Sequence, residues 1–146
     1  MPSTELRVAR FADLDARTFH DLVRLRVDVF VVEQECAYPE IDGRDVEPGT
    51  RHVWLAHDGA PVAYLRILAE PDGSARIGRV VVAPTARSAG HAGRLMTAAL
   101  AEIGDRPCVL DAQSHLVDFY TRHGFTVSGP EYVEDGIPHI PMHRPR

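Results

Sequence analysis

The chain has 146 residues, a formal net charge of −5, a hydrophobic fraction of 45% and a charged fraction of 25%. This length predicts a single domain over residues 1–146 that buries a core without help from metals or disulfides. The acidic balance disfavours a nucleic-acid partner, no apolar run approaches the ~18 residues that cross a bilayer, and the N-terminus lacks a secretory-signal pattern. We therefore expect a cytoplasmic protein with no nucleic-acid and no membrane partner.

The first half of the chain predicts a strand, a helix, a long loop and three further strands. Leu6 and Val8 alternate as in a strand, and Asp13 or Asp15 is placed to cap a helix that runs to about Val32. Residues 33–49 combine acids with prolines and glycines, which predicts a long, mostly irregular loop, and such loops in compact domains are often functional. Turns at 58–59 and 71–73 then separate strands over residues 52–56, 61–68 and 75–82.

The second half of the chain predicts alternating helices and strands. Apolar residues recur at helical spacing, and Gly104 and Gly124 are placed to end two helices. An antiparallel meander followed by this alternation implies an α/β (α+β) fold, with a mixed, mostly antiparallel central sheet and helices on both faces. The expected elements are helices at 90–103 and 116–123, strands at 108–112, 127–133 and 139–143, and a turn at 134–136.

A turn of small residues joins the strand that ends at Val82 to the helix that begins near residue 90. Several backbone N–H groups can converge there with the positive end of the helix behind them, which suits a pyrophosphate. The segment contains neither GxGxxG nor GxxxxGK[ST], and a Gly/Ala-rich helix start without a ligand is an equally good interpretation of the turn alone. The residues of the turn are Arg87, Ser88, Ala89, Gly90, His91, Ala92 and Gly93.

Charge is distributed unevenly along the chain. All 16 basic residues are arginine, and residues 74–101 contain four of them without one acid, so this stretch could receive an anion. Residues 33–47 reverse the balance, with six acids against Arg44 alone, so that stretch could receive a cation. A solvated surface is the ordinary interpretation of either cluster.

Two motifs resemble those of the GNAT (GCN5-related) N-acetyltransferases. The coenzyme A motif of that family is Arg/Gln-x-x-Gly-x-Gly/Ala, and residues 87–92 match it at every fixed position, with Leu95-Met96 where the family has an apolar pair. The family's aromatic-Tyr-x-x-x-Gly-Phe signature is matched by residues 119–125. Ser88 and Gln113 differ from the glycine and asparagine that are usual in the family. Likeness to the ElaA-like branch extends over nearly the whole chain, at residues 26–34, 41–45, 51–52 and 134–140.

The resemblance implies a GNAT-like sheet that is splayed at the acetyl-CoA site. In such a protein the backbone of Val80, Val81 and Val82 pairs with the pantetheine arm like an added strand, and the amides of residues 87–93 bind the pyrophosphate. Tyr120 would then protonate the departing thiolate, and ordinary pKa values of about 10 for tyrosine and about 8.5 for a thiol suit that transfer. A tyrosine packed in the core is the alternative interpretation of this residue.

An ammonium acceptor must lose a proton before it attacks a thioester, so the acceptor side of the site needs a base. Glu33 is the first candidate, because it follows a largely apolar helix and the surrounding motif would point it inward. A surface glutamate or a salt bridge with Arg26 explains Glu33 equally well. His52, His115 and His139 are alternative bases.

Metal and cysteine chemistry are not expected. His139 and His143 have the separation of a metal-binding pair, but neighbouring prolines prevent the helix that would align them. Cys36 and Cys108 lie far apart in no CxxC pattern, which argues against a zinc knuckle and against a disulfide scaffold.

Taken with these residues, the resemblance implies an N-acetyltransferase that moves an acetyl group from the cosubstrate acetyl-CoA to a primary amine by direct attack in a ternary complex. A strand amide such as that of Val82 would hold the oxyanion. The acceptor is expected to be a cationic small molecule or a protein amine, and a homodimer is left open. A non-catalytic acetyl-CoA-binding sensor or regulatory module is the alternative function. A relative of the homoserine-lactone synthases is disfavoured by the short chain and the complete coenzyme A motif.

Overall fold

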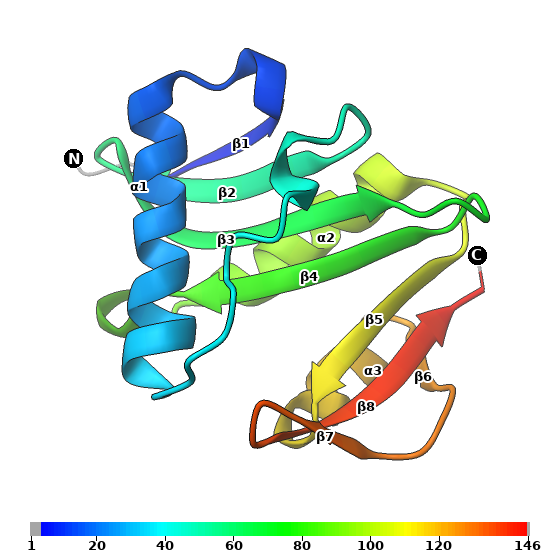
Figure 1. The fold of residues 1–146 in the computed structure, drawn as a ribbon. Coiled ribbons are helices and arrows are strands. Elements are labelled where there is room, and N and C mark those ends of the chain that lie inside the picture. The colour runs from blue at the N-terminus through cyan, green and yellow to red at the C-terminus, as the bar shows by residue number, and fades with distance from the viewer. Residues whose placement is uncertain (1–3, 146) are drawn as a thin grey trace.

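The structure is a computed structural model that describes residues 4–145. Its centre is an eight-stranded sheet with the order β1-β2-β3-β4-β5-β8-β6, and β7 also pairs with β8 (Figure 1). Neighbouring strands are antiparallel except β4 and β5, which confirms the expected mixed, mostly antiparallel sheet. The strands are β1 (Thr4–Arg10), β2 (Arg51–His57), β3 (Ala60–Ala69), β4 (Ala75–Val82), β5 (Cys108–Gln113), β6 (Thr126–Val127), β7 (Tyr132–Glu134) and β8 (Ile137–Arg144).

Helices cover both faces of the sheet (Figure 1). On one face α1 (Ala16–Arg26) continues into a π-helical segment, η2 (Val27–Glu33), and on the other face lie α2 (His91–Ile103) and α3 (Val117–Thr121). Within residues 4–145, no helix is long and apolar enough to span a bilayer. Single 3₁₀ turns lie at Phe11–Asp13, Arg44–Val46, Pro84–Ala86 and Ser114–Leu116.

Alternation along β2 explains why the sheet has a hydrophobic core on each face. Val53 and Leu55 belong to the core that contains Leu95 of α2, whereas Trp54 belongs to the core that contains Leu22 of α1. Successive side chains of a strand point to opposite faces, so a strand between two helical layers is buried on both sides. This arrangement fixes the helices relative to the central strands and so fixes the residues at the helix ends.

The first helix begins and ends at residues that its sequence explains. Asp15 is the cap, since its Oδ1 accepts a 2.7 Å hydrogen bond from the backbone N–H of Thr18. The helical segment that was expected to end near Val32 ends at Glu33, but its last seven residues are the π-helical η2. Such segments are rare and are frequent at functional sites, and this one places Glu33 on the wall of a cleft.

The sheet divides between β4 and β5. Within the described residues these strands pair at only two β4 positions, Ala75 and Arg76. Further along, a shift in the pairing with β3 marks a bulge at Arg79, whose φ of 55° lies in the left-handed region, and β4 diverges from β5 (Figure 1). The backbone edge of Val80–Val82 that faces β5 is therefore not used by a neighbouring strand.

Two predicted elements differ from the structure. The single strand expected at 127–133 is wrong, because β6 and β7 are separate strands and the chain between them leaves the sheet. Pro130 has no N–H to donate, and a Cβ at Gly129 would lie 2.9 Å from Cγ of Pro141, so this stretch cannot accept an ordinary strand residue there. The helix expected at 116–123 is the shorter α3, preceded by a 3₁₀ turn.

Candidate active site

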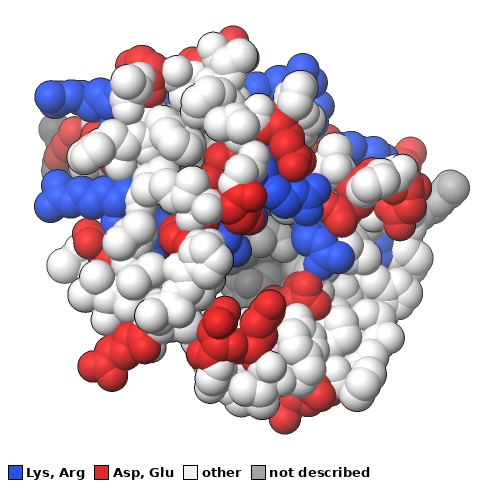
Figure 2. All heavy atoms as spheres, in the orientation of Figure 1, with Lys and Arg blue, Asp and Glu red and all other residues white. Residues whose placement is uncertain are grey.

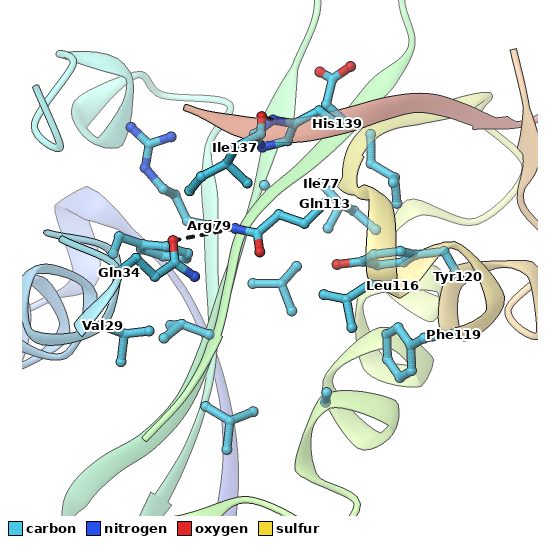
Figure 3. Close-up of a pocket in the computed structure, with 18 of the residues that line it drawn as sticks. Val29, Gln34, Ile77, Arg79, Gln113, Leu116, Phe119, Tyr120, Ile137 and His139 are labelled. Carbon is cyan, nitrogen blue, oxygen red and sulfur yellow. Dashed lines mark hydrogen bonds between the residues drawn. The ribbon is translucent and has the colours of Figure 1, made fainter. Parts of the chain in front are cut away.

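A cleft of about 1180 Å³ opens where β4 and β5 diverge. Its walls come from η2, β4, the turn before α2, the end of β5, α3 and the start of β8 (Figure 3). Ala89 belongs to the turn but does not line the cleft. The predicted site residues that do line it are Glu33, Val80, Val81, Val82, Arg87, Ser88, Gly90, His91, Ala92, Gly93 and Tyr120.

The turn before α2 presents backbone N–H groups that the helix itself does not use. The first helical hydrogen bond runs from N of Arg94 to O of Gly90, so the N–H groups of residues 91–93 precede the bonding ladder of α2. Ser88 and Gly90 have φ values of 68° and 77°, left-handed conformations in which glycine is the least strained residue. With a 13-residue helix behind it, this turn could hold a pyrophosphate.

Glu33 and Arg87 form a bidentate ion pair between η2 and this turn. The two terminal nitrogens of Arg87 donate to the carboxylate of Glu33 at 2.7 and 2.6 Å. These hydrogen bonds hold the pKa of the Glu33 carboxyl below its usual value. The alternative of a salt bridge between Glu33 and Arg26 is wrong, because Arg26 is buried among other carboxylates. A base role for Glu33 stays a prediction, and it requires Arg87 to release the carboxylate.

Tyr120 belongs both to the core and to the cleft. The residue is only 5% exposed and packs against Phe119 and Phe125, with ring centroids 5.0 and 6.4 Å away. Its hydroxyl nevertheless points into the cleft (Figure 3). Burial raises the pKa of this phenol to about 12, so the hydroxyl keeps its proton at neutral pH. The core interpretation and the proton-donor interpretation are therefore compatible.

The acidic stretch 33–47 is not an open cation-binding surface, because its central carboxylates are paired inside the protein. The side chain of Arg26 is 0% exposed, and it donates to Glu40 at 2.6 Å and to Asp45 at 2.8 Å. Burial alone would raise the pKa of Asp45, but the hydrogen bonds and charges of Arg26 and Arg66 lower it below its usual value. Three arginines balance three acids in this arginine–carboxylate cluster, which consists of Arg26, Arg66, Arg79, Glu40, Asp42 and Asp45.

The arginine–carboxylate cluster also forms part of the cleft wall. Arg79 donates to Glu40 at 2.9 Å, and its guanidinium lies 5.4 Å from the ring centroid of Tyr38. Figure 2 shows acidic and basic side chains interleaved beside the hollow on this face. The arginines of 74–101 suggested an anion site in the sequence, whereas Arg76 and Arg79 are both paired with acids of the protein.

Two glutamines meet across the cleft, and sequence analysis gave neither of them a role. Nε2 of Gln113 lies 3.4 Å from Oε1 of Gln34, which joins the end of β5 to the residue after η2 (Figure 3). Ile137 and His139 of β8 complete this side of the wall. Gln34 lies in the part of the sequence that resembles the ElaA-like branch, which is the signal that could have identified it.

Both cysteines are buried and free. Burial raises the pKa of the Cys108 thiol to about 11, which makes it a poor nucleophile at neutral pH. Sγ of Cys36 lies 3.4 Å from O of Asp135 and donates to it, so this residue joins the acidic loop to the β7–β8 turn. Across residues 4–145, no group of three or more His, Cys, Asp or Glu side chains is arranged to hold a metal ion.

Comparison with known proteins gives a consistent result. Residues 19–145 match the family model described as an acetyltransferase (GNAT) domain. A UPF0039 protein of Mycobacterium tuberculosis is 53% identical over 137 residues, which cover 91% of this chain and 88% of the relative. The crystal structure of Escherichia coli ElaA superposes with a TM-score of 0.92 at 37% identity, covering 97% of this chain and 99% of that one.

A further crystal structure is similar over nearly the whole chain. It is of an acyl-CoA N-acyltransferase from Pseudomonas aeruginosa, which superposes with a TM-score of 0.89 at 41% identity over 96% of this chain and 99% of that one. The family model covers the turn before α2, both motifs and the whole cleft. This chain therefore belongs to the GNAT acetyltransferase family, where its near relatives are the UPF0039 and ElaA proteins.

Proposed function

We propose that the protein is an N-acetyltransferase that moves an acetyl group from acetyl-CoA to a primary amine by direct attack in a ternary complex. One observation carries the proposal: the open backbone edge of Val80–Val82, the turn before α2 and the hydroxyl of Tyr120 all border one cleft. Acetyl-CoA has a pyrophosphate at one end of its pantetheine arm and a thioester at the other. The turn before α2, residues 87–93, suits the pyrophosphate and is named the phosphate turn. Tyr120 is placed to serve the thioester.

Backbone groups provide most of the hydrogen bonds to this cosubstrate. The amides of the pantetheine arm pair with the open edge of β4 as an added strand would. The pyrophosphate accepts hydrogen bonds from the N–H groups of residues 91–93. Arg87, which is charged at any physiological pH, exchanges its internal partner Glu33 for phosphate oxygens.

The oxyanion of the reaction has a donor on β4. Ala83 donates its N–H to O of Val62 on β3, and successive N–H groups of a strand alternate in direction. The N–H of Val82 therefore points away from β3, toward the cleft. As the lone pair of the amine forms the new C–N bond, the carbonyl π electrons move to oxygen. The oxygen then accepts a hydrogen bond from the N–H of Val82.

Tyr120 completes the transfer. The C–S bond breaks with its electrons on sulfur, and sulfur takes the proton of the Tyr120 hydroxyl, which water then restores. The nitrogen loses one proton before it attacks and a second proton after the attack, and both end in water. An alkylammonium and acetyl-CoA thus give an N-acetylated amine, free coenzyme A and one released proton.

We propose a cationic acceptor, recognised by the turn between β7 and β8. The arginine–carboxylate cluster has no excess charge, so the acids within it do not attract a cation. Glu134 and Asp135 line the cleft with exposed side chains, and neither has an ion-pair partner among residues 4–145. An ammonium group entering the acceptor side meets these two carboxylates first.

A non-catalytic acetyl-CoA sensor is the competing function. It would need the phosphate turn and the open β4 edge, but it would have no use for a buried phenol whose hydroxyl points into the cleft. Binding of acetyl-CoA without thiol release across a broad amine panel would favour the sensor.

The test combines binding and turnover. We expect calorimetry to detect acetyl-CoA binding and an amine panel to reveal thiol release by the purified protein. Gly90→Glu puts bulk and negative charge into the phosphate turn, and it should abolish binding in a folded protein. Gly73→Glu is the matched control, because Gly73 also has a positive φ and open space around it but lies in a distant turn. Equal acetyl-CoA affinity in the two variants would refute the assignment of the turn.

A further inference from the structure

Three histidines line the cleft, and their surroundings differ. His91 belongs to the phosphate turn, where an anion is expected, and His115 is exposed on the 3₁₀ turn after β5. His139 is half-buried at the start of β8, on the side of the cleft away from the phosphate turn. Only His139 therefore combines shelter from bulk water with a place on the acceptor side.

The hydrogen bond of His139 determines which ring nitrogen is free. Its Nδ1 lies 2.8 Å from O of Ile137, and a carbonyl oxygen can only accept, so Nδ1 carries the proton in the neutral ring. The other nitrogen, Nε2, is then left with an unprotonated lone pair. The ring also stacks on Tyr132, with centroids 5.7 Å apart and planes 20° apart, which holds its orientation.

The strand register brings His139 next to the reacting end of the cleft. His139 lies directly opposite Gln113 in the β5–β8 pair, and Gln113 reaches across to Gln34. Figure 3 shows His139, Gln113 and Tyr120 around the same space, with the Tyr120 hydroxyl turned toward it. The titratable groups around the ring are Tyr132 on β7, Asp111 on β5, and the turn acids Glu134 and Asp135.

The other candidate bases are less well placed. Glu33 pairs with Arg87 of the turn before α2, which puts it on the phosphate side of the cleft and not on the acceptor side. His52 is 0% exposed: its Nε2 lies 3.0 Å from O of Asp45 and its Nδ1 lies 2.6 Å from the hydroxyl of Tyr64, so neither nitrogen is free. Burial also lowers the pKa of His52. His52 therefore cannot take a proton from an acceptor without first losing a hydrogen bond.

We propose that Nε2 of His139 is the catalytic base that deprotonates the acceptor ammonium. This inference rests on the proposed function and assigns a residue to one of its steps. The N–H bond of the ammonium breaks, its proton bonds to Nε2, and its electron pair becomes the lone pair that attacks the thioester carbon. The imidazolium, with protons on both nitrogens, then releases the Nε2 proton to water. The cycle begins again with neutral His139.

Two amines of one shape test the proposal. The first is the alkylamine with the highest kcat/KM in the acceptor panel, and the second is its analogue with fluorine on the carbon β to nitrogen, whose ammonium is a much stronger acid. At a pH between the pKa values of the two ammonium ions, the fluorinated amine reaches the protein already neutral and does not need a base, whereas the alkylamine is still protonated. His139→Gln should lower kcat/KM for the alkylamine by about 10²-fold and for its analogue by less than tenfold.

A matched variant and a spectroscopic measurement separate the outcomes. His143→Gln makes the same change on the same strand outside the cleft, and it should leave both rates unchanged. Equal losses for the two amines in His139→Gln would overturn the base role and leave the acyl transfer itself standing.

Nitrogen-15 NMR of the wild-type protein provides a test that needs no turnover. Neutral His139 should carry its proton on Nδ1, and a proton on Nε2 would overturn the proposal.

Discussion

The hydroxyl of Tyr120 lies at the edge of the core and faces the cleft, and burial makes it a weaker acid than an ordinary phenol. A pKa of about 12 keeps the proton on oxygen at neutral pH, yet the anion it forms after donation is a strong base that water quickly reprotonates. Tyr120→Phe removes the hydroxyl and keeps the ring that packs against Phe119 and Phe125. We expect kcat to fall on the order of 10²-fold with little change in acetyl-CoA affinity. Steady-state kinetics and calorimetry on the same preparation measure both.

Tyr38→Phe provides the comparison, since Tyr38 is a half-buried tyrosine that also lines the cleft but bonds to Glu40. Its loss should perturb turnover much less than the loss of Tyr120. Wild-type kcat in Tyr120→Phe over the full pH range would contradict the donor role.

The pair between Glu33 and Arg87 predicts that loss of Glu33 strengthens acetyl-CoA binding. Loss of a glutamate that contacts the cosubstrate would weaken it. An internal carboxylate competes with phosphate for Arg87. Glu33→Gln removes that competitor and should tighten acetyl-CoA binding several-fold, with the gain shrinking at high salt, because both side chains are partly exposed. Glu35→Gln removes the next acid, which has no ion-pair partner among residues 4–145, and should change affinity little. Calorimetric titration at two salt concentrations measures the difference, and weaker binding by Glu33→Gln would contradict the competition.

At the scale of elements, the arginine–carboxylate cluster joins α1, the acidic loop and β3. Removing one member leaves a buried charge without its partner, which typically costs about 3–5 kcal/mol. Arg26→Met should lower the free energy of unfolding by that amount, as measured by urea titration. Arg24→Met changes the same helix on its exposed side, where Arg24 lies 3.9 Å from Asp28, and should cost less than about 1 kcal/mol. Similar stabilities for the two variants would mean that the cluster contributes little.

The elements themselves followed from local patterns, whereas the cluster did not. Asp15 and Gly104 are caps that depend on their immediate neighbours, so the sequence indicates where α1 begins and α2 ends. Glu40 and Asp45 instead meet arginines that are 14 to 21 positions away, since Arg26 pairs with both acids and Arg66 pairs with Asp45, and only the folded sheet brings them together. A count of six acids in one stretch therefore suggested an exposed surface where the protein has a buried network.

Some parts of the candidate site could be predicted from the sequence and others could not. The phosphate turn and Tyr120 belong to motifs that the sequence shows, and both line the cleft. The pair between Glu33 and Arg87 links residues 54 positions apart, and the sequence offered Arg26 as the nearer partner. His139 was one of several histidines in the sequence. It is distinguished only by the carbonyl that its Nδ1 meets and by its register opposite Gln113.

At the scale of the whole molecule, one short parallel contact between β4 and β5 joins two halves of the sheet. The larger half carries α1 and α2, and the smaller half carries α3 and the β7–β8 turn (Figure 1). The phosphate turn belongs to the first half, while Tyr120, His139 and the turn acids belong to the second. In the proposed function, the cosubstrate and the acceptor meet at the line where the two halves separate.

Because the internal cluster is neutral, long-range attraction of a cationic acceptor must come from the exposed acids of the second half. Charge complementarity of this kind speeds encounter, and salt screens it beyond a Debye length of about 8 Å near physiological ionic strength. The double variant Glu134→Gln with Asp135→Asn should therefore lower kcat/KM for the best amine several-fold at low salt and little at high salt. Its kcat at saturating amine should remain close to that of the wild type, because the groups that move protons are unchanged.

The control variant removes the same amount of negative charge elsewhere. Asp58→Asn with Asp28→Asn changes two exposed acids outside the cleft, one of them in the β2–β3 turn, where Asp58 has a φ of 50°, close to the 53° of Asp135. Net charge alone would make the two double variants behave alike, whereas local recognition makes only the first sensitive to salt. Stopped-flow or initial-rate kinetics at two ionic strengths distinguish these cases. If the preferred acceptor is an anion, or if both variants keep wild-type efficiency at low salt, then the β7–β8 turn does not attract the acceptor, and the phosphate turn and Tyr120 assignments are unaffected.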